Sequence, residues 1–99
     1  MTPVRTSLHE EAIAEARAAR RWYAERDSDV GVAFMVALDA AVELIAKTPN
    51  LWPMFEAGTR RYLVKNFPYS LIYRRLSKGI QIVAVMHSRR RPGYWRSRL

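Results

Sequence analysis

The sequence has 99 residues, of which 49% are hydrophobic and 26% charged, with a net charge of +8 and no cysteine. These values fit one folded domain over residues 1–99 and exclude a disordered chain, a disulfide framework and a thiolate metal site. The N-terminus has no apolar signal-peptide core, and Asp39 and Glu43 interrupt the most apolar run. We therefore expect a cytoplasmic protein that is neither secreted nor membrane-spanning.

The charge is divided unevenly along the chain. Residues 1–57 carry six Lys or Arg and all nine Asp or Glu, a net of −3, whereas residues 58–99 carry eleven Lys or Arg and no acid, a net of +11. A division of this kind indicates one basic surface that meets a polyanion or an acidic protein partner. The alternative is a basic surface that only keeps the protein soluble.

The N-terminal region predicts a short strand and then a helix. Alternation of Val4 and Thr6 with Arg5 and Ser7 indicates a strand over residues 3–7. Ser7 stands three residues before Glu10, the spacing of a capping box, so we expect the helix to begin near Leu8 or His9. The apolar stripe of this helix consists of Ala12, Ala16, Ala19 and Tyr23. Ile13 and Trp22 are expected to support it.

A second helix is expected over residues 29–47, with Asp27, Ser28 or Asp29 as its N-cap and Thr48-Pro49 as its end. The two helices then form an antiparallel hairpin. The apolar face of the second helix contains Phe34, Leu38, Ala41 and Ile45. The loop that follows contains four residues of the kind that is usually buried: Leu51, Trp52, Met54 and Phe55.

From Arg60 the hydrophobic period changes to two, which predicts three strands joined by turns at residues 67–68 and 77–79. The last strand, residues 80–87, is apolar on both sides and should be central in the sheet. The predicted fold class is α+β. It consists of an N-terminal strand, an antiparallel helical hairpin and a three-stranded antiparallel meander, with the helices on one face of the sheet.

Candidate functional residues follow the same strands. Arg61, Arg74 and His87 belong to three neighbouring strands, and on a shared exposed face they would form a phosphate pocket beside a titratable group. No carboxylate follows Glu56, so we expect no metal site, no metal-dependent nuclease and no cofactor. The residues expected to bind the target or a nucleic acid are Lys65, Arg89, Arg90, Arg91 and Arg96.

Two of these residues, and Trp95 of the tail, also have a simpler structural interpretation. His87 can hydrogen-bond a backbone carbonyl, and Arg74 can pair with Asp39 or Glu43 on a helix. Trp95 is expected to pack on the sheet as part of the core rather than to stack on a base.

Four motifs follow one another along the chain: W-Y at 22–23, P-x-x-x-P at 49–53, R-x-x-x-x-x-F-P-Y-x-L-I-Y-R at 61–74 and A-V-x-H-x-R-R-x-P-x-Y-W-x-x-R at 84–98. Their order resembles the RelE/ParE superfamily of bacterial toxins from type II toxin–antitoxin modules. The resemblance implies a small cytoplasmic toxin that forms a hetero-oligomer with a cognate antitoxin. An acidic antitoxin segment would fold as it binds the basic half of the chain, on the sheet face or along the helical hairpin.

The resemblance leaves two cellular targets open. The F-P-Y and H-x-R-R-x-P-x-Y-W forms are more similar to the ParE, or plasmid-stabilisation, side, which implies inhibition of DNA gyrase through the basic tail and the sheet face. The alternative is a RelE-like, ribosome-dependent and metal-independent mRNA endonuclease. In that case the positions that match the RelE pocket, and would be catalytic, are Arg61, Arg74, His87 and Tyr94.

Overall fold

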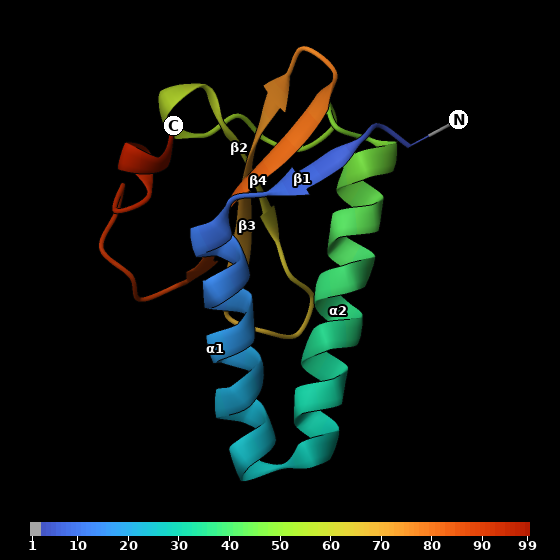
Figure 1. Ribbon diagram of the computed structural model, residues 1–99, viewed down its shortest axis with the longest axis vertical. Helices are drawn as coiled ribbons and strands as arrows, with labels where there is room; N and C mark the ends of the chain where they lie inside the picture. Colours follow the sequence, from blue (N-terminus) through green and yellow to red (C-terminus); the bar gives the residue numbers. More distant parts are fainter. Residues whose placement is uncertain (1–2) are drawn as a thin grey trace.

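Two antiparallel helices, α1 (Glu10–Arg26) and α2 (Ser28–Lys47), pack on one face of a four-stranded sheet (Figure 1). The structure is a computed structural model that describes residues 3–99. The strands are β1 (Thr6–Leu8), β2 (Arg60–Leu63), β3 (Tyr69–Leu76) and β4 (Gly79–His87). The predicted α+β architecture, with a strand, a helical hairpin and an antiparallel meander, is confirmed.

The sheet has the strand order β1-β4-β3-β2, so β4 is central as predicted. β1 pairs with β4 in parallel, whereas β2 with β3 and β3 with β4 are antiparallel. The N-terminal strand begins later than expected, at Thr6 instead of residue 3. Gly79 permits the close approach of β1, because a Cβ atom at this position would lie 2.2 Å from the carbonyl oxygen of Arg5.

The start of α1 corrects the sequence prediction. The N-cap is His9, whose Nδ1 accepts a hydrogen bond from the Glu11 amide at 3.0 Å. Ser7 forms no capping box, because it lies within β1, where its hydroxyl donates to the Ile80 carbonyl at 3.5 Å. Strand pairing thus takes precedence over the local capping signal. Of the three predicted N-cap candidates for α2, the structure shows Asp27, whose carboxylate accepts a hydrogen bond from the Asp29 amide at 2.9 Å.

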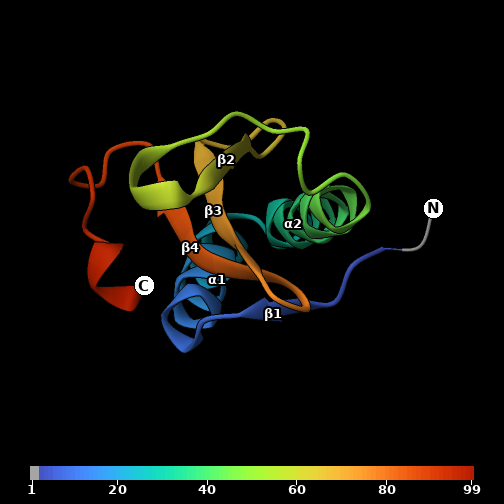
Figure 2. The same cartoon turned by 90° about the horizontal axis from the view of Figure 1, so that it is seen from above.

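Apolar side chains form two clusters, one on each face of the sheet. The larger lies beneath the helices and includes Ala12, Phe34 and Ile82. The smaller lies on the opposite face, called here the outer face, where Ile72 and Ala84 pack against Trp95. Figure 2 shows that the C-terminal segment lies on the side of β4 away from α2. The prediction that Trp95 belongs to the core is therefore confirmed, since its side chain is fully buried.

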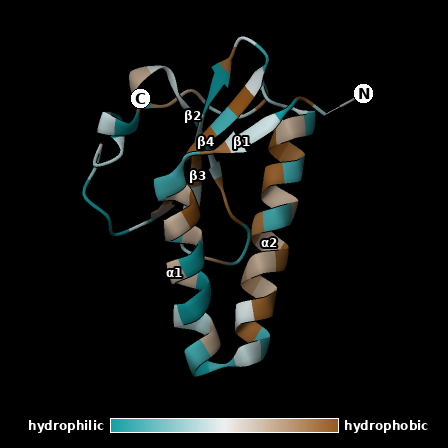
Figure 3. Ribbon diagram, in the orientation of Figure 1, coloured by the Kyte–Doolittle hydropathy of each residue, from teal (hydrophilic) through white to brown (hydrophobic). Residues whose placement is uncertain are grey.

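Several apolar residues remain at the surface. Trp22, expected to support the stripe of α1, is 52% exposed, and the loop residues Leu51 and Met54 are 66% and 61% exposed. Trp52 and Phe55 are half-buried, so only part of the loop acts as the predicted anchor. Figure 3 shows that α2 is more hydrophobic than α1 along most of its length. Within residues 3–99, neither helix combines the length and the apolar character needed to cross a membrane.

Candidate functional site

The six residues 88–93, called here the basic loop, follow β4 and carry Arg89, Arg90 and Arg91. All three arginines are exposed. The start of the loop is held by hydrogen bonds around His87: its Nδ1 accepts from the Arg89 amide at 3.0 Å, and its carbonyl accepts from the Arg90 amide at 3.0 Å. The Ser88 amide donates to the Pro68 carbonyl at 2.8 Å. The loop therefore begins in a turn that is fixed to the end of the sheet.

The other end of the basic loop is held by Tyr94 and Trp95. Trp95 is buried in the outer-face cluster, whereas the Tyr94 hydroxyl donates to the Glu15 carboxylate of α1 at 2.6 Å. Two adjacent side chains thus anchor the chain on the outer face and on α1. Arg96 adds an ion pair with Glu56. Because both ends are fixed, the three loop arginines are presented on a segment with little freedom to rearrange.

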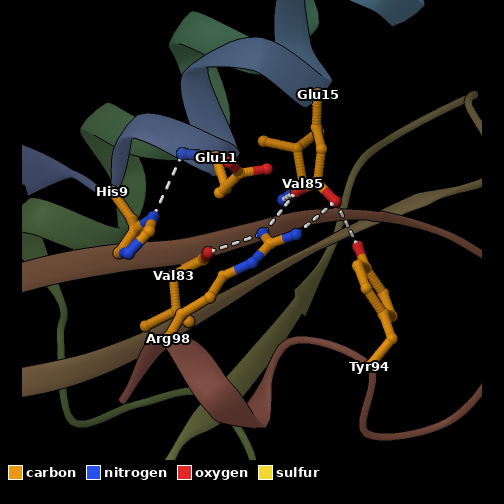
Figure 4. A network of polar contacts seen from close by, with 7 residues as sticks. All are labelled: His9, Glu11, Glu15, Val83, Val85, Tyr94 and Arg98. Carbon is orange, nitrogen blue, oxygen red and sulfur yellow. Dashed lines mark hydrogen bonds and ion pairs between the residues drawn. The ribbon is translucent and has the colours of Figure 1, made fainter.

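Glu15 joins three parts of the molecule (Figure 4). Its carboxylate accepts hydrogen bonds from the Val85 amide at 3.0 Å, from the Tyr94 hydroxyl and from two nitrogens of Arg98, at 2.8 and 3.1 Å. The sequence reasoning missed this residue. A signal was present, because Glu15 lies three residues after Ala12 and four before Ala19, on the buried stripe of α1.

Glu15 and Arg98 also cover an open strand edge. β1 pairs with β4 only at Ile80, Gln81 and Ile82, so the rest of β4 has no strand on that side. Here the Arg98 guanidinium donates to the Val83 carbonyl at 3.0 Å, and Glu15 accepts from the Val85 amide. The two side chains take the place of a strand, which satisfies backbone groups that would otherwise be costly to bury.

This environment shifts the titration of two groups. Burial, followed by the hydrogen bond to Glu15, raises the pKa of the Tyr94 phenol. The hydrogen bond to Glu15 is also the main cause of the raised pKa of Arg98. Tyr94 is therefore a firmly neutral hydrogen-bond donor, and a group of this kind is poorly suited to act as a general base near neutral pH.

A pocket of about 590 Å³ lies between α1, the paired ends of β3 and β4, and the basic loop. His87 lines its sheet side, where the imidazole and the Tyr69 ring meet edge to face with their centres 5.0 Å apart. The side chains that give the pocket its character are Trp22, Tyr23, Tyr69, His87, Arg90 and Tyr94. Three residues of the sequence-based candidate set, His87, Arg90 and Tyr94, are thus brought together here.

The other candidates lie elsewhere. Arg61 is paired with Ile72 of the outer-face cluster, and its guanidinium lies 5.0 Å from the Phe55 ring. The Nε of Arg74 donates to Gln81 at 2.9 Å, on the same outer face. Lys65 is exposed in the turn between β2 and β3. The structure therefore does not bring Arg61 and Arg74 onto one face with His87, because His87 pairs with Tyr69 on the helix side.

The structure also differs from the simpler interpretations of His87 and Arg74. His87 accepts a backbone amide hydrogen bond instead of bonding a carbonyl. Arg74 does not pair with Asp39 or Glu43, because it bonds Gln81 and Glu43 pairs with Lys47 at 3.1 Å. In the part of the chain that the structure describes, no group of three or more His, Asp or Glu side chains could hold a metal ion.

A second concavity of about 720 Å³ lies on the other side of α1, between α1, α2 and β1. Its apolar lining includes Leu8, Ile13 and Leu38. The α1 rim carries the exposed arginines Arg17, Arg20 and Arg21, and the α2 rim carries Asp39 and Glu43. It is called here the hairpin groove.

Comparisons with known proteins agree with this architecture. A solved structure described as the chromosomal ParDE TA system from P. aeruginosa has the same fold, with a TM-score of 0.76 at 18% sequence identity. The match covers 85% of this chain and 95% of that chain. No curated protein sequence shows a significant match. The family model of the ParE toxin of type II toxin-antitoxin system, parDE, matches residues 7–92. This chain therefore belongs to the ParE toxin family of type II toxin–antitoxin systems.

Proposed function

We propose that this ParE-family toxin inhibits DNA gyrase by binding it through the basic loop and carries out no bond-breaking chemistry of its own. The observation that carries the proposal is the loop itself. Its three arginines are exposed, while His87 on one side and Tyr94 and Trp95 on the other hold its ends. A preorganised set of cations loses little conformational entropy on binding, so it favours tight association with a protein or a protein–DNA complex.

The arrangement of the other candidates favours binding over RNA cleavage. Cleavage by attack of a 2′-hydroxyl needs a base, a cation and an acid around one phosphate. Arg61 and Arg74 lie on the outer face, whereas His87 and Tyr94 line the pocket beside α1. The Tyr94 hydroxyl is already committed to Glu15. These four residues therefore offer no single pocket of the RelE kind.

A charge-matched pair of variants tests the gyrase proposal. Replacing Arg89, Arg90 and Arg91 together by glutamine should weaken inhibition of gyrase supercoiling at least about tenfold. Replacing Arg17, Arg20 and Arg21 by glutamine removes the same charge from the hairpin groove and should change inhibition by less than about twofold. Equal losses of inhibition in the two variants would show that only the net charge matters and would contradict a specific role of the basic loop.

A parallel assay addresses cleavage. The wild-type protein is added to a translating extract, and primer extension then maps the ends of the messages. We expect no new ends within ribosome-bound messages. If messages are cleaved and supercoiling is unaffected, the gyrase proposal is wrong and the protein is an mRNA endonuclease.

Membership of a toxin–antitoxin family implies an antitoxin partner, and we place its segment in the hairpin groove. The groove has an apolar floor and three arginines on one rim, which suits an amphipathic segment with acidic residues on one side. Titration calorimetry with the product of the adjacent gene should show tight binding that weakens with salt. The α1 triple variant should bind it at least about tenfold more weakly, and the loop triple variant should not. If the α1 variant binds the antitoxin as tightly as wild type, the antitoxin binds a surface other than the hairpin groove.

A further inference from the structure

We infer that the pocket between α1 and the basic loop receives one large apolar side chain from an acidic segment of the protein partner that the loop binds. The inference rests on the proposed function, because it names what the target presents to this face. It adds a specific anchor to an interaction that charge alone would leave unselective.

The helix wall of the pocket is an aromatic residue held at the surface. Trp22 is 52% exposed and lines the pocket. The Arg26 guanidinium lies 3.6 Å from the centre of one ring of Trp22, and Tyr23 meets Trp22 edge to face at 5.2 Å. Exposed, preoriented tryptophans of this kind are enriched at the centres of protein interfaces.

The rest of the lining is also packed in place. Tyr23, beside Trp22 on α1, and Tyr69 of β3 are partly buried against the helix-side cluster. On the loop side, the Arg90 guanidinium lies 3.9 Å from the centre of the Tyr94 ring. Glu15 is the acidic side chain of the pocket, and its carboxylate is already bonded by Val85, Tyr94 and Arg98. An incoming acidic segment therefore meets little repulsion inside the pocket.

The size and the rim of the pocket define the occupant. A volume of about 590 Å³ falls within the range of roughly 300–1,000 Å³ typical of small-molecule pockets, so it leaves ample room for one large side chain. Arg90 lines the pocket on the loop side, next to Arg89 and Arg91, and His87 lines it at the end of β4. No Asp or Glu follows Glu56 in the chain. Aromatic walls favour a large apolar side chain, and the cationic rim favours acidic neighbours on either side of it.

Two tryptophan substitutions on α1 test the inference. Ala18 lines the pocket and is exposed, so Ala18→Trp places a large side chain in the pocket without entering the core. Ala14 is exposed on the same helix, one turn earlier and outside the pocket lining, so Ala14→Trp is the matched control. Ala18→Trp should weaken gyrase inhibition at least about tenfold with unchanged melting temperature and antitoxin affinity, and Ala14→Trp should not.

A peptide assay separates this inference from the proposed function. The probe is a fluorescein-labelled peptide of glutamates around one central phenylalanine, and its control has alanine in the centre. Wild type should bind the phenylalanine peptide at least about tenfold more tightly, and Ala18→Trp should remove that difference. If wild type does not inhibit gyrase, the proposed function fails while these peptide measurements still decide the pocket.

Several results would contradict the inference about the pocket. Equal binding of the two peptides would show that charge alone acts. Loss of antitoxin affinity in Ala18→Trp, with gyrase inhibition unchanged, would assign the pocket to the antitoxin. Tighter binding of single-stranded oligothymidine than of the peptide, also blocked by Ala18→Trp, would assign it to nucleic acid. If Ala18→Trp lowers the melting temperature, Trp22→Ala replaces it, and retention of the peptide difference in that variant would contradict the inference.

Discussion

The Glu15 carboxylate and the Arg98 guanidinium form a two-point ion pair, at 2.8 and 3.1 Å, across the half of β4 that β1 leaves unpaired. Both side chains are shielded, with 15% and 11% of their surfaces exposed. Each also bonds the β4 backbone, at Val85 and Val83. The C-terminal segment is therefore part of the sheet edge, so the position of the basic loop depends on a carboxylate in α1.

Glu15→Ala should lower the free energy of unfolding by about 3 kcal/mol, because it leaves Arg98, the Tyr94 hydroxyl and the Val85 amide without their acceptor. Urea denaturation followed by circular dichroism measures the change. Glu25→Ala removes an exposed carboxylate from the same helix and should cost less than about 0.5 kcal/mol. Equal costs at the two positions would mean that the ion pair contributes nothing beyond helix charge.

The raised pKa of Tyr94 predicts a loss of stability in alkali. Since the folded protein holds the phenolic proton more tightly than the unfolded chain, this contribution is complete below the unfolded pKa near 10. It is lost as pH rises from there through the folded pKa, by up to about 1.4 kcal/mol per pH unit for one tyrosine. Urea midpoints between about pH 9 and about pH 11 should fall less steeply for Tyr94→Phe than for wild type. Parallel slopes would contradict the assignment to Tyr94.

The fold followed from the sequence where periodicity and packing agree. The stripes of Ala12, Ala16 and Ala19 on α1 and of Phe34 and Leu38 on α2 are all buried. The period of two after Arg60 correctly marked three strands, and the apolar character of β4 correctly placed it in the centre. These signals are repeated over many residues, so no single competing contact could reverse them.

The site was less accessible from the sequence because it depends on contacts between distant residues. Strand alternation alone could not show that the register shifts between Ile72 and Tyr73, or that His87 ends on the helix side. Glu15 and Arg98 are 83 positions apart, and their meeting depends on where the tail turns after Trp95. The parallel pairing of β1 with β4 is likewise a long-range contact that no local pattern records.

Gly79→Ala should destabilise β1 selectively. At Gly79 φ is +153°, and a Cβ would lie 2.2 Å from the Arg5 carbonyl oxygen, so the β1 backbone must move. We expect a cost of at least about 2 kcal/mol and faster hydrogen exchange of the β1 amides. Gly58→Ala is the control: φ there is +76°, but no atom beyond the neighbouring residues of the chain lies within 4 Å of the new Cβ, so only the backbone strain of about 1 kcal/mol remains. Similar costs and unchanged β1 exchange would refute the packing role of Gly79.

Arg74 and Arg90 lie on different surfaces, so single substitutions can separate the sheet face from the loop. Arg74 bonds Gln81 on the outer face, whereas Arg90 packs on Tyr94 at the pocket. Arg90→Gln should weaken gyrase inhibition about fivefold or more, because it removes a charge and a pocket wall together. Arg74→Gln removes the same charge and should change inhibition by less than about twofold, as measured by the concentration that halves supercoiling. If instead Arg74→Gln were the more damaging variant, the target would contact the outer face of the sheet, and the basic loop would lose its assigned role.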